Sequence, residues 1–298
     1  MKIDKNNSSK AFTLIELLVV ISIIGMLSSI ILATLSGVRE KGTLASGQTF
    51  DRHTYGAWYE DLVLAWDFDT DSGTTVQDQT GNGNNLTLTD TTSLVTDSNY
   101  NPFKNGKVLD IVNTSKTAVT GSPINSPTPI VNDFSISLWI YPRGGEFGSV
   151  EIISNFYSPL AAGKWMISIQ DGGKLSFLAR SNINSGFSPS VPQILIKSGQ
   201  WYHAMAVCNG TKGTLYVNGK VATDSKLLSS GGNCSYLSTV PIIMNARLLN
   251  GSVFPYYVDN VRIYNKAFTV AMAEELYLAE KDKFDNLAIG DNGKINNK

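Results

Sequence analysis

Histidine, cysteine and charged residues are all scarce in this sequence. The 298 residues include two histidines and two cysteines, which leaves no Cys/His pattern for a zinc site. Neither a nucleophile elbow nor a phosphate-binding loop is present. Charged residues make up 16% of the chain and the formal net charge is −1, so the chain offers no electrostatic attraction to nucleic acid. We therefore predict no nucleic-acid partner.

Glutamate is almost absent from the middle of the chain, which bears on catalysis. Between Leu62 and Tyr264 the only glutamates are Glu146 and Glu151, on either side of a glycine-containing turn. A glycosidase needs two carboxylates facing one sugar, about 5 Å apart for retention or about 6.5–9.5 Å apart for inversion. Two glutamates on a loop or on opposite strand faces do not meet this need. We predict that the protein is not an enzyme.

One long apolar run stands near the start of the chain. From Phe12 to Leu35 the only charged residue is Glu16. As a helix this run would be about 36 Å long, enough to cross a hydrocarbon core of about 30 Å. The polar leader over residues 1–11 suggests a secretory signal peptide, but the run is longer than the apolar part of such a peptide, and no small-x-small cleavage site follows Leu35. We predict a retained membrane helix over residues 12–41, in which the Glu16 carboxylate needs a partner.

The segment Phe12–Leu17, with Glu16 as its fifth residue, closely resembles the N-terminal motif of type IV pilins and of the pseudopilins of type II secretion systems. The resemblance implies that a prepilin peptidase cuts between Ala11 and Phe12, and that the new amine of Phe12 is methylated. Glu16 would then face the N-terminal ammonium of a neighbouring subunit in a filament. Ala11 departs from the glycine that the family nearly always has before the cut. An uncleaved single-span anchor is the alternative.

The same resemblance implies a location. The chain would cross the bacterial cytoplasmic membrane once, with the rest of the protein outside the cytoplasm, and would reach the cell surface in an assembled filament. Beyond the apolar run, repeated glycines weaken any continuing helix. We therefore predict a linker over residues 42–61.

Beyond the linker, the hydrophobic period changes from that of a helix to that of a strand. Residues 134–142 alternate between apolar and polar, residues 171–173 separate two strand-like segments, and Asn218–Gly219 favours a type I′ hairpin. Strands at this spacing, without interleaved helices, predict an antiparallel β-sandwich. We expect the sandwich to span residues 62–281 and a polar tail to follow over residues 282–298.

Six short motifs occur in order along this region: 65–69, 78–84, 134–140, 199–203, 214–220 and 259–267. Together they resemble the laminin-G-like, concanavalin-A-like jelly roll found in many bacterial surface proteins. The resemblance implies a mainly β fold, but it does not identify a ligand.

Asp259 is the carboxylate for which the sequence predicts an unusual environment. Strand parity places Asp259 on the face of Val261 and Ile263, which we expect to be buried. A buried, ionised carboxylate must be paired or bound to a metal ion. Arg262, Arg247 or backbone donors could pair with it.

A metal is the other possibility, because domains of this type often hold a structural Ca²⁺, a cation that prefers oxygen ligands. Asn260 stands where the family frequently has a second acid. By resemblance, the calcium ligands would be Asp69, Asp78, Asn84 and Asp259.

The two cysteines, Cys208 and Cys234, both lie far beyond the apolar run. In an extracytoplasmic compartment they could form a disulfide that contributes about 3 kcal/mol to stability. Two unlinked thiols are the alternative, because pairing requires Cα atoms within about 7 Å.

Two functions are consistent with these patterns. The first is a structural subunit of a type IV pilus-like or pseudopilus filament, displaying a jelly-roll head that mediates adhesion. The second is a membrane-anchored surface lectin or adhesin that does not assemble. The expected partners are prepilin peptidase, other pilin subunits, the membrane, and a surface glycan or protein. Glu16 and the cleavable leader favour the filament, because a plain anchor needs neither.

Overall fold

The computed structural model describes residues 14–24 and, with gaps, residues 58–285. In the second stretch the described residues are 58–69, 73–88, 94–95, 106–111, 118–120, 124, 133–144, 150–155, 164–170, 172–180, 191–210, 212–222, 226–227, 241–244 and 255–285. The chain divides into two compact units, Met1–Phe50 and Asp51–Lys298.

Residues 14–24 of the first unit form an α-helix. Its apolar side chains are exposed on every face, from 46% at Val20 to 81% at Leu14, and Glu16 is its only charged residue. A helix that is apolar all round is typical of one buried in lipid or in an assembly. The rest of the helix predicted over residues 12–41 lies outside the described residues. Among the residues that the structure describes, no helix combines the length and apolar character needed to span a membrane.

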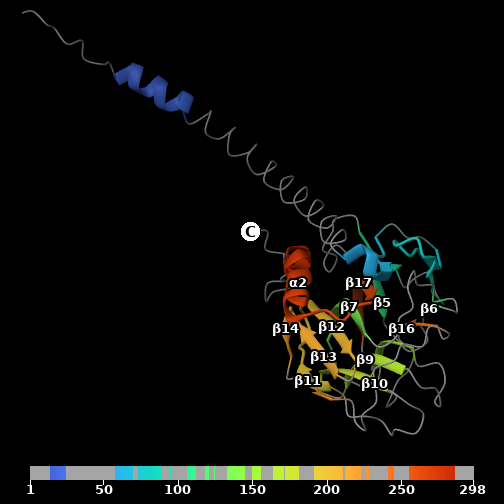
Figure 1. Ribbon diagram of the computed structural model, residues 1–298. Helices are drawn as coiled ribbons and strands as arrows, with labels where there is room; N and C mark the ends of the chain where they lie inside the picture. The colour runs from blue at the N-terminus through green and yellow to red at the C-terminus, as the bar shows by residue number, and fades with distance from the viewer. Residues whose placement is uncertain are drawn as a thin grey trace, which may run out of the picture. The chain divides into compact units, whose positions relative to one another are not determined.

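The second unit is an antiparallel β-sandwich of two sheets, which confirms the predicted fold class (Figure 1). Sheet A has nine strands in the order β14-β13-β12-β7-β17-β5-β4, with β1 beside β17 and β15 beside β13. Its strands are β1 (Leu62–Trp66), β4 (Leu94–Val95), β5 (Val108–Ile111), β7 (Asp133–Pro142), β12 (Tyr202–Asn209), β13 (Lys212–Val217), β14 (Lys220–Val221), β15 (Lys226–Leu227) and β17 (Tyr256–Tyr264).

Sheet B has eight strands in the order β11-β10-β9-β8-β16-β6-β3-β2. They are β2 (Thr75–Val76), β3 (Leu86–Leu88), β6 (Ala118–Thr120), β8 (Val150–Ser154), β9 (Lys164–Gln170), β10 (Lys174–Arg180), β11 (Val191–Leu195) and β16 (Ile243–Met244).

The main core lies between the two sheets, and alternation along each strand decides which side chains enter it. From sheet B, Trp165 of β9 and Phe177 of β10 are fully buried in this core. From β7 of sheet A, the residues in the core are Phe134, Ile136, Leu138 and Ile140. The residues between them, including Trp139 and Tyr141, face the opposite side of sheet A, where a second apolar layer forms.

Two predicted hairpins are present, with the turn residues that the sequence indicates. Gly172 and Gly173 join β9 to β10 with φ of 80° and 78°. Asn218 and Gly219 join β13 to β14 with φ of 51° and 74°. Positive φ at both central residues is the requirement of a type I′ turn, which explains the choice of Asn-Gly.

The beginning and the end of the head are joined. Strand β1 lies antiparallel beside β17, and immediately outside this pair Lys266 forms an ion pair with Asp61 at 2.9 Å. Trp58, just before the short 3-10 helix Tyr59–Asp61, packs against Phe268 with ring centroids 5.1 Å apart. The segment that enters the sandwich is therefore attached to the segment that leaves it.

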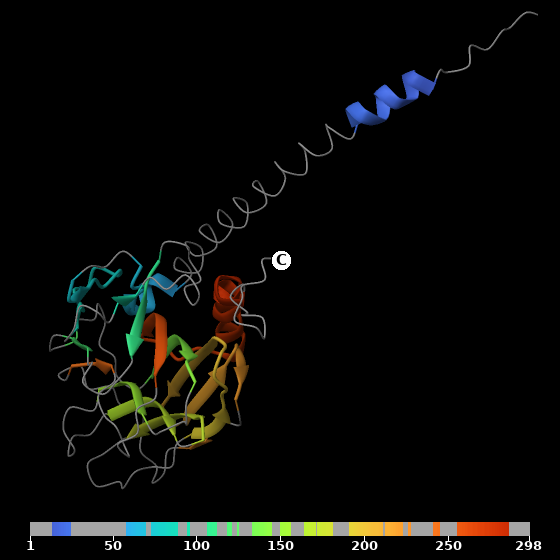
Figure 2. The same ribbon diagram turned by 180° about the vertical axis from the view of Figure 1, so that it is seen from behind.

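The C-terminal helix α2 (Val270–Asp285) covers the outer face of sheet A. Views from the front and from behind both show it beside the strands β12 to β14 (Figure 1 and Figure 2). Sheet A is consequently buried on both faces, by sheet B on one side and by α2 on the other.

Candidate functional site

Asp78 holds together the loop that follows β2. Its carboxylate accepts hydrogen bonds from the backbone N–H groups of Ala65, Thr80 and Asn84 at 3.0–3.1 Å and from the Thr80 hydroxyl at 2.8 Å. The Asn84 side chain donates to the Val63 carbonyl at 2.9 Å. Two of the four predicted calcium ligands are therefore engaged with neighbouring protein groups.

Asp259 lies at a β-bulge in strand β17. It is opposite Trp139 of β7, whereas Arg262 is opposite Ser137, so that two residues of β17 face one residue of β7 between these pairs. Asn260, inside the bulge, has a positive φ of 47°. The expected burial of Asp259 is confirmed, since the residue is 0% exposed.

The face predicted for Asp259 is wrong, and the bulge is the reason. Val261 and Ile263 lie in the core between the sheets, as expected. Asp259 instead shares a row with Trp139, which belongs to the outer layer of sheet A. One inserted residue reverses the alternation of side chains, so strand parity counted across Asn260 gives the opposite face.

The carboxylate of Asp259 is only partly compensated. One oxygen, Oδ1, accepts a hydrogen bond from the Asn260 backbone N–H at 2.7 Å, while Oδ2 has no hydrogen-bond partner among the described residues. Burial raises the pKa of Asp259 well above its ordinary value, and the negative charges of Asp69 and Asp67 raise the pKa further. The Asn260 hydrogen bond and the positive charge of Lys283 act in the opposite direction.

These surroundings test the calcium prediction residue by residue. Asp69 and Asp67 are the carboxylates whose charges act on Asp259, and Asp69 also accepts a hydrogen bond from the Lys107 backbone at 3.2 Å. A buried carboxylate oxygen without a hydrogen-bond partner suits a hard cation. Within the described segments, however, no three His, Cys, Asp or Glu side chains are grouped so that they could hold a metal ion. Calcium binding stays a prediction, best supported for Asp259 and Asp69.

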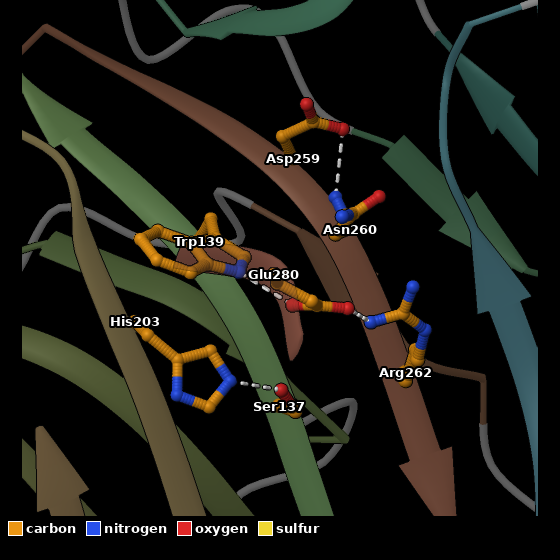
Figure 3. Close-up of polar contacts among 7 residues, drawn as sticks. All are labelled: Ser137, Trp139, His203, Asp259, Asn260, Arg262 and Glu280. Atoms are coloured by element: carbon orange, nitrogen blue, oxygen red, sulfur yellow. Dashed lines mark hydrogen bonds and ion pairs between the residues drawn. The ribbon is translucent and has the colours of Figure 1, made fainter. Parts of the chain in front are cut away.

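A buried glutamate of α2, Glu280, connects the helix to sheet A (Figure 3). Glu280 is 1% exposed, and its carboxylate forms an ion pair with Arg262 of β17, which is 3% exposed. The second carboxylate oxygen accepts a hydrogen bond from the Trp139 indole N–H at 2.5 Å. Arg262, considered above as a partner for Asp259, is thus paired with α2 instead.

His203 lies on strand β12, opposite Trp139 of the adjacent strand β7. Its Nε2 is 2.8 Å from the Ser137 hydroxyl, and Nδ1 has no hydrogen-bond partner within the described segments. Burial, together with the positive charge of Arg262, lowers the pKa of His203 to about 3. The imidazole is therefore neutral at physiological pH. It is fully buried, as is Ser137, so the Ser–His pair has a structural role rather than a catalytic one.

Aromatic rings complete the layer between α2 and sheet A. Phe284 stacks on Trp139 and meets Trp201 edge-on, with centroids 3.9 Å and 5.0 Å away. Tyr277 lies 5.9 Å from Trp139 and 6.0 Å from His203. These rings are buried or half-buried against one another, as expected for aromatics in the core of a sandwich.

The sequence prediction did not single out Glu280, although one signal was present. Ala273, Leu276, Glu280 and Phe284 recur at the three- and four-residue spacing of one helix face. A glutamate within such an apolar stripe indicates a buried partner on the opposing surface. The partners themselves come from distant strands, so they could not be assigned from the helix alone.

The remaining predicted residues fall in different places. Ala11, Phe12 and Cys234 lie outside the described residues. Glu16 is exposed on the helix of residues 14–24. Cys208 is fully buried on β12 and takes part in a disulfide. Because Cys234 lies outside the described residues, its pairing with Cys208 stays a prediction.

Two family models match this chain. Residues 6–32 match the prokaryotic N-terminal methylation motif, and residues 112–272 match a laminin-G-type model of the concanavalin A-like lectin/glucanases superfamily. No curated protein matches the sequence.

Solved structures share the fold of the head. The ligand-binding domain of botulinum neurotoxin serotype D, in complex with N-acetylneuraminic acid, matches with a TM-score of 0.58 and 12% identity, over 76% of this chain and 53% of that chain. The binding domain of Paraclostridial Mosquitocidal Protein 1 matches with a TM-score of 0.57 and 20% identity, over 73% and 52% of the two chains. The binding domain of botulinum neurotoxin DC, in complex with rat synaptotagmin II, matches with a TM-score of 0.56 and 15% identity, over 74% and 52%. This chain spans about half the length of the structures it matches, and identities this low show the fold alone.

Together these matches indicate a pilin-like N-terminal segment followed by a lectin-like domain. The lectin-like match covers more than half of the 298 residues. The chain therefore belongs to the concanavalin A-like lectin/glucanases superfamily and carries a prokaryotic N-terminal methylation motif ahead of that domain.

Proposed function

We propose that this chain is a structural subunit of a type IV pilus-like or pseudopilus filament, and that its jelly-roll head recognises a surface glycan or protein. One observation carries the proposal: a single chain joins the N-terminal methylation motif at residues 6–32 to a lectin-like domain at residues 112–272. The motif supports assembly and the domain supports recognition.

The N-terminal helix supplies the physical basis for assembly. All the apolar side chains of residues 14–24 are exposed, and burying them in lipid or among neighbouring helices is favourable. Glu16 opposes this burial unless a positive charge neutralises it. Cleavage between Ala11 and Phe12 by a prepilin peptidase would create such a charge, an N-terminal ammonium on each subunit. Before assembly the subunit would be held in the bacterial cytoplasmic membrane, and it would reach the cell surface as part of the filament.

The recognition role of the head rests on its structural neighbours. One of them was solved with N-acetylneuraminic acid and another with rat synaptotagmin II, and about half of each of those chains matches this chain. In the present head, α2 occupies the outer face of sheet A. We therefore assign recognition to the loops and edges of the sandwich rather than to that face.

A membrane-anchored surface lectin that does not assemble is the second candidate. It shares the lectin-like domain and the apolar N-terminal helix, but it needs neither Glu16 nor cleavage before Phe12. The two candidates therefore differ in the consequence of removing the Glu16 carboxylate.

The deciding experiment compares filaments from cells that express the parent chain or the Glu16→Ala variant. Antibodies to the head should label filaments in the parent, and labelling should fall sharply in Glu16→Ala while the amount of protein in the membrane stays the same or rises. Ser22→Ala is the matched control in the same helix, because Ser22 is uncharged and its hydroxyl donates to the Leu18 carbonyl one turn away. Normal filament labelling in Glu16→Ala would support the anchored lectin instead.

Calcium is a further part of the proposal, limited to the residues that fit. We propose that Asp259 and Asp69, with Asp67 close by, hold one structural Ca²⁺ through carboxylate oxygens. The support is the buried Oδ2 of Asp259 and the convergence of negative charge around it. A bound cation would neutralise this charge and stabilise the bulge that carries Asp259.

A further inference from the structure

Helix α2 contacts sheet A through one narrow stripe of side chains. Among the α2 side chains whose burial the structure describes, the buried ones, at 0–2% exposure, are Ala273, Leu276, Glu280 and Phe284. Three of them are apolar and could pack against many positions on a sheet. Glu280 is the exception, because a carboxylate is tolerated in such a layer only where its partners are in reach.

The partners of Glu280 come from two neighbouring strands. One carboxylate oxygen pairs with Arg262 of β17, and the other accepts from the Trp139 indole of β7 (Figure 3). Both oxygens are therefore directed to fixed points on the sheet, and these points lie on either side of the helix contact. Such a two-point contact defines a position along the helix axis as well as an orientation.

A close approach near the middle of α2 is consistent with a single seating. Gly219, in the β13–β14 turn, has a positive φ of 74°, and a Cβ atom there would lie 3.0 Å from Tyr277 and 3.1 Å from the Glu274 Cα. The turn thus touches the helix backbone, leaving little space for the helix to move toward β14.

We propose that Glu280 sets the register of α2 on sheet A. A shift of the helix by one turn, about 5.4 Å, would leave its apolar residues in an apolar layer but would carry Glu280 away from both partners. Glu280 would then be a buried carboxylate separated from both of these partners, which is far more costly than the loss of an apolar contact. The ion pair selects one position of α2 on sheet A among several that the apolar residues allow.

This register determines what the last turn of α2 covers. With Glu280 between Arg262 and Trp139, Phe284 lies face to face on Trp139 and edge-on to Trp201. In any other seating these tryptophans would lose the ring that covers them. The inference concerns the head alone and does not depend on filament assembly or on a ligand.

The test uses the full chain in detergent with four variants: Arg262→Met, Glu280→Leu, the double variant, and Glu275→Leu as a control on the exposed face of the same helix. Each single variant should lower the melting temperature, because it leaves one charge buried without its partner. The double variant should melt above both single variants but below the parent, because the Trp139 indole N–H still lacks its acceptor. Its α2 amides should exchange about tenfold faster than those of the parent, with weaker near-UV circular dichroism from the tryptophans.

Two results would overturn the proposal. If the double variant keeps the parent's amide protection and circular dichroism, the register is set without the ion pair. If the double variant is as unstable as the single variants, the pair contributes stability and not register. Should the single variants fail to fold, Glu280→Gln keeps the side-chain shape and the acceptor for Trp139. It should accelerate α2 exchange, and unchanged exchange would equally contradict the proposal.

Discussion

Phe284 and Trp139 stack face to face, with ring centroids 3.9 Å apart and ring planes 10° from parallel. Phe284 belongs to the last turn of α2 and Trp139 to the middle of β7, so this contact fastens the end of the helix to the sheet. The lectin-like family match ends at residue 272. The head of this protein therefore includes a structural element beyond the part that the family model covers.

Replacing Phe284 by alanine should lower the free energy of unfolding by about 3–5 kcal/mol, because it removes a buried ring and leaves a cavity beside Trp139. Urea denaturation followed by tryptophan fluorescence measures the change. Leu278→Ala is the control, since Leu278 is 46% exposed on the same helix and should change stability by less than about 0.5 kcal/mol. Equal effects of the two substitutions would show that the last turn of α2 is not docked.

His203 should make the head less stable in mild acid. Its pKa is about 3 in the folded head, against an ordinary value of 6.5, so the unfolded chain binds a proton first as the pH falls. The contribution of His203 to stability is complete above pH 6.5 and decreases by about 1.4 kcal/mol per pH unit below it, toward the folded pKa. Urea unfolding between about pH 7 and pH 5 should show a slope that His203→Gln removes.

Ser137→Ala provides the matched control for this titration. It removes the hydroxyl beside Nε2 but leaves the buried imidazole, so the pH slope should persist even if overall stability falls. If His203→Gln and the parent share the same slope, another group is responsible for the acid sensitivity.

Calcium should stabilise the head through Asp259 and not through Asp78. At about a hundred times Kd, calcium would add about 2.7 kcal/mol to the free energy of unfolding. Asp259→Asn should abolish the difference between melting curves recorded with calcium and with chelator. Asp78→Asn should destabilise the protein in both conditions, because the Asp78 carboxylate accepts hydrogen bonds from Thr80 and Asn84 of its own loop and from Ala65 of β1. Melting curves of the parent that are indifferent to chelator would remove calcium from the proposal.

The buried Cys208 should be linked to Cys234, the only other cysteine in the sequence. Peptide mapping without reductant should recover the two residues in one cross-linked pair. Cys208→Ala and Cys234→Ala should each lower stability by about 3 kcal/mol, because either change opens the same loop in the unfolded chain. A Cys234→Ala variant with the parent's stability would argue against this pairing.

Processing at the N-terminus should generate a chain that begins with Phe12. N-terminal sequencing of the membrane-extracted protein should find a methylated phenylalanine, and Ala11→Gly should leave cleavage unimpaired or make it faster, since glycine is the residue that prepilin peptidases usually meet. An intact Met1, or a cut after Leu35, would contradict the pilin assignment.

The strands were the most predictable part of this head, because alternation and turn residues are local signals. The alternation within residues 134–142 and the Asn218–Gly219 turn correspond to β7 and to the β13–β14 hairpin. Because of the bulge at Asn260, the same alternation assigned Asp259 to the wrong face of its strand. An inserted residue reverses the face of its neighbours, and a short sequence gives no sign of it when the residue is not a glycine.

The buried polar cluster was harder to predict than the strands. Glu280, Arg262 and Trp139 are brought together by the docking of a helix on two strands, which is a non-local event. Each residue taken alone has an ordinary interpretation. Glu280 resembles a charged residue on a helix surface, Arg262 a charged residue on a strand, and Trp139 an aromatic residue in the core. Only the apolar stripe around Glu280 hinted at a partner, and nothing near it in the sequence indicated which partner that would be.

The pairing of β1 with β17 has a consequence for how the head is made. Asp61, at the start of the sandwich, and Lys266, just after β17, are 205 residues apart and in contact. Sheet A therefore lacks the neighbour of its first strand until nearly the whole chain has been synthesised. Contacts of such long sequence separation slow folding, because a large loop must close before any of them stabilises the chain. Until β17 is complete, β1 presents an unpaired edge, and this interval is when the nascent head is most exposed to mispairing with other chains.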